Sequence, residues 1–195
     1  SLSLFALSLP APSLLAIGGR PLVDSVGPNT AKGLTNQTMP TAMRKMKAVV
    51  VNAINDFATE NLTLDAPNTE ELLIRMKATG VCRSDYSVIN GTIPMQLPCV
   101  IGHEGAGVVE QVGDNVEGFS VGDHVVLSFV PFCGECNDCL HERPNMCTAG
   151  DVAVGKMLDG TSRVHRGDED IDVMTLLGCM AEYVVCAPIN VIKID

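Results

Sequence analysis

Aromatic side chains are scarce in this chain of 195 residues, which has no tryptophan, two tyrosines and five phenylalanines. A core built without them has to rely on valine, leucine, isoleucine and methionine. Hydrophobic residues make up 46% of the sequence and charged residues 18%. This balance is typical of a globular protein and excludes a disordered one.

Basic residues are also few, with 13 Lys and Arg against 23 Asp and Glu, for a net charge of −10. Such a charge disfavours non-specific binding to nucleic acid. Long apolar runs are lacking too, because Pro10 and Pro12 interrupt the one at residues 2–17 and leave it too short to span a bilayer. We therefore expect neither a nucleic-acid partner nor a membrane.

Residues 1–45 differ in composition from the remainder of the chain. They are rich in Ser, Leu, Ala and Pro, and Asp24 is their single acid. We predict a poorly ordered extension here and a domain over residues 46–195, which opens on a β-branched run. An acid-poor, hydroxyl-rich segment is also typical of a transit peptide, so organellar targeting remains an alternative to untidy upstream sequence.

Short β-branched or alternating segments follow, separated by glycine and proline turns. The pattern predicts one short helix at residues 84–90, capped by Ser84 or Asp85, and a long, polar, acidic loop at residues 150–178. It predicts strands at residues 48–51, 71–78, 105–112, 124–130, 181–186 and 191–194. The predicted fold class is mainly β, a small barrel of short strands.

Four cysteines in a short stretch form the most specific motif. They stand at intervals of three, three and eight residues: Cys133, Cys136, Cys139 and Cys147. A chain that turns back at this spacing can place four thiolates around one ion, as in a structural zinc site. Disulfides this close would be strained, and scattered single cysteines elsewhere suggest a reducing compartment such as the cytoplasm. We predict a four-cysteine zinc lobe; since its shell is closed, the chemistry must lie elsewhere.

Cys82 and His103 offer two further metal-ligand types. Thiolate and neutral imidazole are the ligands of a catalytic zinc with an open position. Taken alone, a buried thiol and a satisfied core histidine would be the ordinary interpretation. However, glycines on both sides of the Gly-His-Glu sequence at His103 let the backbone crowd a site. Asp85 can accept a hydrogen bond from the imidazole, as carboxylates behind zinc-bound histidines usually do.

These motifs, in this order, resemble the zinc-dependent medium-chain alcohol dehydrogenases. Gly-His-Glu at His103 is followed at the family's spacing by Gly107 and Gly113, Cys82 stands 21 positions before His103, and the cysteine lobe comes next. The resemblance covers residues 46–195. It implies a GroES-like catalytic domain, a barrel from which the zinc lobe protrudes.

The resemblance also implies roles for single residues. Cys82 and His103 are two of three protein ligands of the catalytic zinc, and Glu104 lies beside the metal, where it assists ligand exchange. Ser84 would hold the alcohol hydroxyl and pass on its proton. Arg83 would meet the pyrophosphate of the cofactor.

The implied reaction transfers a hydride between a small alcohol or aldehyde and NAD(P), while zinc polarises the substrate oxygen. The implied cofactors are therefore a catalytic Zn²⁺, a structural Zn²⁺ and, in the full-length enzyme, NAD(P). A homo-oligomer is implied for that enzyme. Some members carry a relay histidine where this chain has Ser87, so the exit route of the proton stays open.

Two parts of the family pattern are lacking. The glycines at 102, 105 and 107 are not a Gly-x-Gly-x-x-Gly between a strand and a helix. The third catalytic cysteine is expected shortly downstream of Asp195, whereas Cys179 and Cys186 correspond to ordinary barrel positions. We therefore expect a truncated catalytic domain, inactive alone and without the nucleotide-binding domain.

Other classes of protein have some of the same motifs and are alternative interpretations of this sequence. A glutathione-dependent formaldehyde dehydrogenase has all of them, and a non-catalytic zinc-binding module would end at Asp195. Polyol dehydrogenases fit less well, because they usually have Gly at the position of Arg83. A zinc-free quinone reductase fits worst, because it would need neither metal motif. The sequence chooses neither the alcohol nor between NAD and NADP.

Overall fold

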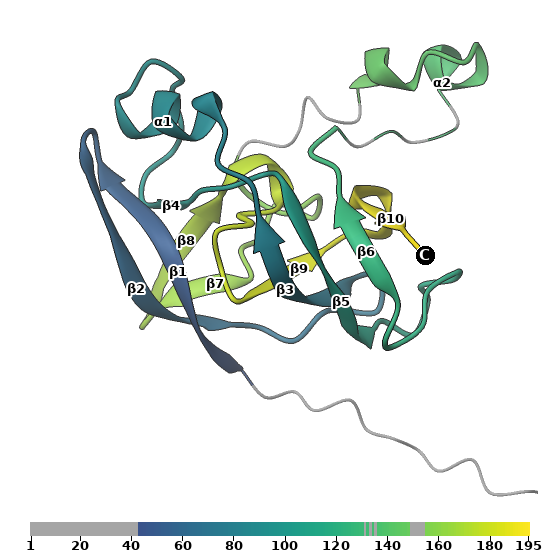
Figure 1. Ribbon diagram of the computed structural model, residues 1–195, viewed down its shortest axis with the longest axis horizontal. Helices are drawn as coiled ribbons and strands as arrows, with labels where there is room; N and C mark the ends of the chain where they lie inside the picture. The colour runs from purple at the N-terminus through teal and green to yellow at the C-terminus, as the bar shows by residue number, and fades with distance from the viewer. Residues whose placement is uncertain (1–42, 131, 133, 135, 149–154) are drawn as a thin grey trace, which may run out of the picture. The chain divides into compact units, whose positions relative to one another are not determined.

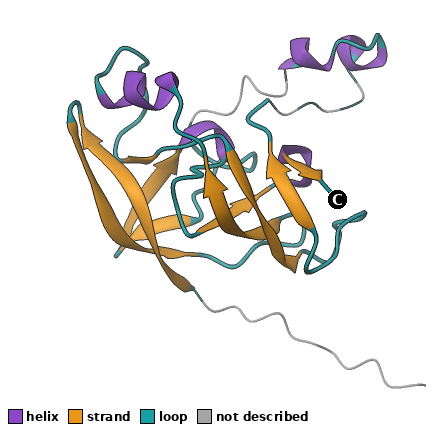
Figure 2. Ribbon diagram, viewed as in Figure 1, coloured by secondary structure: helices purple, strands orange, loops and turns teal. Residues whose placement is uncertain are grey.

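The computed structural model describes residues 43–130, 132, 134, 136–148 and 155–195. Within them the strands form two sheets, as Figures 1 and 2 show. A closed barrel contains, in order, β1 (Arg44–Ala53), β2 (Asp56–Leu64), β7 (Val164–Arg166), β8 (Glu169–Val173) and β4 (Cys99–Val100). The second sheet contains β10 (Val191–Lys193), β6 (His124–Leu127), β5 (Gly105–Val112), β3 (Leu72–Thr79) and β9 (Tyr183–Cys186). The predicted class, mainly β with a barrel of short strands, is confirmed.

The helices are short. Besides α1 (Arg83–Ile89) and α2 (Asn137–Leu140), the described residues contain the 3-10 turns η1 (Pro144–Met146), η3 (Met174–Leu176) and η4 (Pro188–Asn190). None of the helices in this part of the chain is long and apolar enough to cross a membrane.

The barrel begins with a long hairpin. β1 and β2 pair from Arg44 with Leu64 to Ala53 with Asp56, so two residues make the turn. Asn55 has a φ of 63°, a conformation that asparagine adopts more readily than most residues and that two-residue hairpins favour. The strand therefore starts two residues before the predicted domain start at Met46, and the extension predicted at residues 1–45 lies almost wholly outside the described residues.

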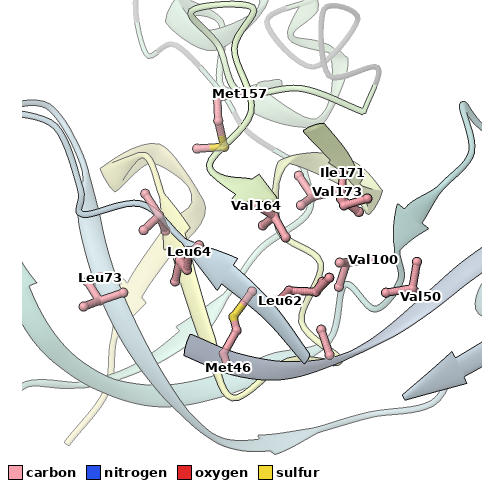
Figure 3. Close-up of a cluster of buried hydrophobic side chains, with 12 residues drawn as sticks. Met46, Val50, Leu62, Leu64, Leu73, Val100, Met157, Val164, Ile171 and Val173 are labelled. Atoms are coloured by element: carbon pink, nitrogen blue, oxygen red, sulfur yellow. The ribbon is translucent and has the colours of Figure 1, made fainter. Parts of the chain in front are cut away.

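β3 separates two hydrophobic cores. Leu73 faces the barrel interior, where Met46 and Leu64 also point (Figure 3). Leu72 and Ile74, on the other face, pack into the second core. Both faces of β3 are therefore buried at its start, and its last three residues, 77–79, are exposed.

The prediction of a long loop at residues 150–178 is wrong for the second half of that segment, which contains β7 and β8. Val164, Ile171 and Val173 are buried in the barrel core, and β8 lies parallel to β4. Acidic residues stand next to these apolar residues in β8, and they hid the apolar pattern that would have predicted a strand. Asp172 can be buried because Lys156 Nζ lies 3.5 Å from its Oδ1. Neither β2 nor β4 was predicted.

A two-bond ion pair fastens the segment before β7 to the start of β3. Arg163 Nε donates to Glu71 Oε2 at 3.0 Å and Nη2 to Oε1 at 2.9 Å, and both side chains are mostly buried. Such a two-bond geometry is the strongest form of this contact. Asp159 also binds Arg163. Charge thus holds this segment together with apolar packing, since Met157 is buried in the barrel core.

The remaining predicted elements differ only at their ends. β6 stops at Leu127, three residues earlier than predicted, because Asn190 N, the next donor along the ladder with β10, bonds to Ala187 O instead. β9 starts at Tyr183 and β10 stops at Lys193.

Candidate functional site

Cys82 occupies the N-cap of α1, three residues after β3 ends at Thr79. Asp85, the third residue of the helix, accepts a hydrogen bond from the Cys82 backbone N–H through Oδ2 at 2.7 Å. This is the reciprocal contact of a capping box, with cysteine in place of serine or threonine. The predicted cap at Ser84 or Asp85 is therefore wrong by position, although the Asp85 side chain does the capping.

His103 is held between β4 and β5 by backbone contacts. Gly102 has a φ of 101°, and a Cβ there would lie 2.6 Å from the backbone N of Met180, so only glycine fits. The Gly102 carbonyl accepts a hydrogen bond from Cys179 N at 2.8 Å. These contacts leave His103 only 4% exposed.

Two side chains of α1 face the His103 ring. Nδ1 lies 3.2 Å from Asp85 Oδ1, and Nε2 lies 3.1 Å from Ser84 Oγ. The first pair is not aligned as a hydrogen bond, and among the described residues neither atom has another partner. Since a carboxylate only accepts, the contact is attractive when the proton sits on Nδ1. Nε2 then presents its lone pair, which accepts from the Ser84 hydroxyl.

Cys82, His103 and Glu104 form a candidate metal site. One donor atom from each lies within 4.8 Å of the other two. Gly80 leaves room for the acid, because a Cβ there would lie 2.1 Å from Glu104 Oε2. Sulfur, nitrogen and oxygen donors of this kind fit Zn²⁺. The buried pair of Nδ1 and Asp85 fits as well, because a proton held on Nδ1 would leave the lone pair of Nε2 as the metal donor.

Phe129 covers another side of the imidazole, and no sequence pattern predicted this contact. Its ring centre lies 5.1 Å from that of His103, at an interplanar angle of 81°. The ring is 49% exposed. The only signal available was the rarity of aromatic residues, together with its place at the end of a predicted strand.

Arg83 and Ser87 lie on the exposed side of α1. The Arg83 guanidinium lies 5.3 Å from the ring centre of Tyr86, within the range of a cation–π contact. Ser87 Oγ donates to the Arg83 carbonyl at 3.1 Å. The hydroxyl at the relay position is thus engaged with the helix backbone.

Three of the four lobe cysteines form the second cluster. The sulfurs of Cys136, Cys139 and Cys147 lie within 4.8 Å of one another, and all three residues are half-buried. Cys136 is the N-cap of α2, and Cys147 follows η1. Cys133, the predicted fourth ligand, lies outside the described residues.

Two further cysteines, Cys99 and Cys179, are buried thiols outside both clusters. Burial, with a smaller contribution from the Asp85 charge, raises the pKa of Cys179 to about 12. Burial and Asp172 raise the pKa of Cys99 to about 12 as well. Within the described ranges, Cys179 is not among the residues whose donor atoms gather with those of Cys82 and His103.

Taken together, the barrel and the two ligand clusters define a class, the zinc-type alcohol dehydrogenase domains. A family model described as the alcohol dehydrogenase GroES-like domain matches residues 68–195. The chain belongs to this family.

Relatives of known name agree with this. The NDMA-dependent alcohol dehydrogenase of Amycolatopsis methanolica is 42% identical over 154 residues, which cover 78% of this chain and 42% of that protein. The S-(hydroxymethyl)glutathione dehydrogenase of Saccharomyces cerevisiae is 38% identical over 163 residues, 81% of this chain and 42% of that protein. The chain thus spans less than half the length of the relatives it matches.

A solved structure shows the same fold. The alcohol dehydrogenase zinc-binding domain protein from Burkholderia ambifaria has a TM-score of 0.74 and 34% sequence identity. The match covers 79% of this chain and 43% of that one. The GroES-like barrel is therefore confirmed by both sequence and structure.

Proposed function

We propose that the full-length protein is a zinc- and NAD(P)-dependent oxidoreductase that interconverts small alcohols and aldehydes, and that this chain is part of its catalytic domain. The observation that carries this proposal is the gathering of the Cys82, His103 and Glu104 donor atoms within 4.8 Å. The family and the names of its relatives support the reaction class.

The residues of this chain would bind the metal and transfer the proton of the alcohol. When bound, zinc polarises the substrate oxygen and lowers the pKa of an alcohol hydroxyl. Cys82 and Nε2 of His103 would hold the ion, while Asp85 keeps the proton on Nδ1. Ser84 Oγ, 3.1 Å from Nε2, would lose that contact and be free to bind the alcohol hydroxyl. Its oxygen would accept the proton of the alcohol while its own hydroxyl proton passes to solvent water.

The surroundings of the site would select and orient the reactants. Phe129 presents an apolar wall beside His103, which favours the carbon side of a small alcohol over water. The Arg83 guanidinium is exposed and available for the cofactor pyrophosphate. Its planar group of N–H donors can bind two oxygens of such an anion at once. Ser87 is bonded to the helix backbone, so the proton leaves by way of Ser84 and solvent.

The second cluster would be structural. With Cys133 added, Cys136, Cys139 and Cys147 would complete a closed shell of four thiolates around Zn²⁺. Cytoplasmic location and assembly of the full-length protein into a homo-oligomer stay predictions.

A second candidate reaction is the oxidation of S-(hydroxymethyl)glutathione. It is favoured by the yeast relative of that name, 38% identical to this chain. Both reactions need the same ligands, so only the substrate distinguishes them.

The test uses the full-length protein, a series of primary alcohols, S-(hydroxymethyl)glutathione, and NAD or NADP. We expect oxidation of at least one alcohol, and a loss of turnover of several orders of magnitude in His103→Ala. The control is His165→Ala, a histidine bound to Asp65 and Asp170 outside the site. Near-normal turnover in His103→Ala would refute the proposal, and activity with the glutathione adduct alone would select the second candidate.

A further inference from the structure

The ladder between β6 and β10 ends in an unusual pair, Ser128 and Asn190. Leu127 pairs with Val191, so these two residues form the next rung. Ser128 N donates to the Asn190 carbonyl at 2.8 Å. In an antiparallel pair of this type each residue donates to the other. The return bond is diverted here, because Asn190 N donates to Ala187 O, 3.0 Å away, inside η4.

The Asn190 side chain supplies the missing bond. Its Nδ2 donates to the Ser128 carbonyl at 2.9 Å, and the residue is fully buried. A partly buried carbonyl is stabilised by such a partner, and an apolar side chain has no donor to offer. Asn190 Oδ1, in contrast, is buried and has no hydrogen-bond partner among the described residues. Burying that oxygen is unfavourable, so the bond to Ser128 is the contribution that explains an amide at this position.

Ser128 is the last fixed point before Phe129. Beyond Ser128 the described residues of this ladder make no further backbone pairing, and Phe129 is half exposed, so burial of its own ring fixes it only weakly. The two bonds to Asn190 set the direction in which the chain leaves the sheet. That direction brings the Phe129 ring to 5.1 Å from the His103 ring.

We propose that Asn190 is a positioning residue of the candidate site, acting through Ser128 and Phe129 on the imidazole of His103. Asp85 and Ser84 contact the two ring nitrogens, and Phe129 contacts the ring itself. Together they hold the plane of the ring, and with it the direction of Nε2. The inference rests on the proposed function in that His103 is taken as a metal ligand.

The first test is spectroscopic and needs no metal. In the chain labelled on histidine and phenylalanine, we expect cross-relaxation between the His103 and Phe129 rings and a ring-current shift of the His103 carbon-bound protons. Asn190→Ala should lose both and give His103 resonances close to those of Phe129→Leu. The matched control is Val191→Ala, which removes a buried side chain from the next residue and should leave both signals unchanged.

A double variant separates positioning from general support. If Asn190 acts through Phe129, the His103 resonances of Asn190→Ala/Phe129→Leu should equal those of Phe129→Leu alone. Asn190→Ser, which keeps a shorter donor, should lose only part of the ring contact. Unchanged signals in Asn190→Ala would overturn the proposal. Loss of the fold in both Asn190 variants would overturn it too, since the residue would then serve the whole sheet.

Cobalt(II) titration separates this inference from the proposed function. Binding that is weaker in Asn190→Ala than in Val191→Ala supports both. Binding at His103 that is equal in the two variants overturns the positioning role and leaves the proposed function standing. Cobalt binding that His103→Ala does not change would refute the metal site, whereas the ring contact would still be decided by the spectra.

Discussion

The two ligand clusters of this chain are built in opposite ways. Cys136, Cys139 and Cys147 lie within one short segment, which contains α2 and η1, and all three are half-buried. Cys82 and His103 come from different parts of the fold, the start of α1 and the link between β4 and β5. His103 is buried and contacts three supporting side chains.

The difference shows which site depends on the barrel. The cysteine cluster needs only local turns, so its spacing in the sequence is enough to define it. The Cys82 and His103 cluster exists only where β3, β4, β5 and the 179–180 segment are correctly packed. We therefore expect metal binding at the two clusters to respond differently to the same changes.

The largest expected effect is at the cysteine cluster. Structural zinc in short peptides binds with an apparent energy of about 10–16 kcal/mol near neutral pH. The purified chain should keep one tightly bound zinc through dialysis, and Cys136→Ser should lose it, as measured by elemental analysis. Asn145→Ser, an exposed change in the same lobe, should keep the metal. Two tightly held zinc ions would instead mean that the His103 cluster is complete without a further ligand.

A change in the core of β3 should separate the clusters. Ile74 is fully buried, and replacing it with alanine should lower the free energy of unfolding by about 2–5 kcal/mol. Denaturant titration measures this, and metal analysis should show weaker binding at His103 with the lobe still loaded. Ile192→Ala, at a residue 51% exposed, is the control for the same deletion. Equal loss of metal at both clusters would contradict the comparison.

Asp85 should affect one cluster alone. Asp85→Asn should weaken metal binding at His103 by roughly 10–100-fold, because the amide can present a donor to Nδ1 and no longer favours its proton. Metal titration followed by absorbance would measure this, with Asp114→Asn, an exposed acid, as the control. If the cysteine cluster weakens as much, Asp85 supports the fold rather than the ligand.

The smallest expected effect is a loss of stability in acid, caused by a carboxylate outside both clusters. Hydrogen bonds from Thr161 and Arg163 lower the pKa of Asp159 from 3.8 to about 2. This carboxylate therefore stabilises the fold above pH 3.8 and loses that contribution as the pH falls toward 2. The effect is small because the side chain is 44% exposed.

Metal must be removed before that measurement, since acid also protonates the ligands. In chelator-treated chain, Asp159→Asn should flatten the fall of unfolding free energy between pH 3.8 and about 2. Asp168→Asn, at an exposed acid, should leave the slope unchanged. An unchanged slope in both variants would mean that Asp159 does not stabilise this loop.

Local patterns carried the sequence predictions that succeeded. The apolar alternation near Ile74 and the glycine-bounded segment at 105–112 gave β3 and β5, because each pattern is contained within its own strand. Residues 84–90 gave α1 with an error of one residue at each end. The ligand roles of Cys82 and His103 came from family resemblance, and they stay predictions even though the structure brings these residues together.

Contacts between distant residues could not be predicted in the same way. β8 is rich in acids and is a strand because β4 and β7 lie on its two sides. Phe129 and Asn190 have no pattern of their own. Their importance comes from a ring contact with His103 and from one diverted bond in η4.

The closure of the barrel by late strands has a consequence for synthesis of the protein. β7 pairs with β2 at His165 and Thr63, and β8 with β4 at Asp172 and Cys99, so no closed barrel can form before the ribosome has made Val173. At a translation rate of roughly 5–20 residues per second, this is several seconds after His103 is made. The cysteine segment emerges within that interval and needs no barrel. The order of residues along the chain therefore lets the cysteine cluster form before the barrel closes.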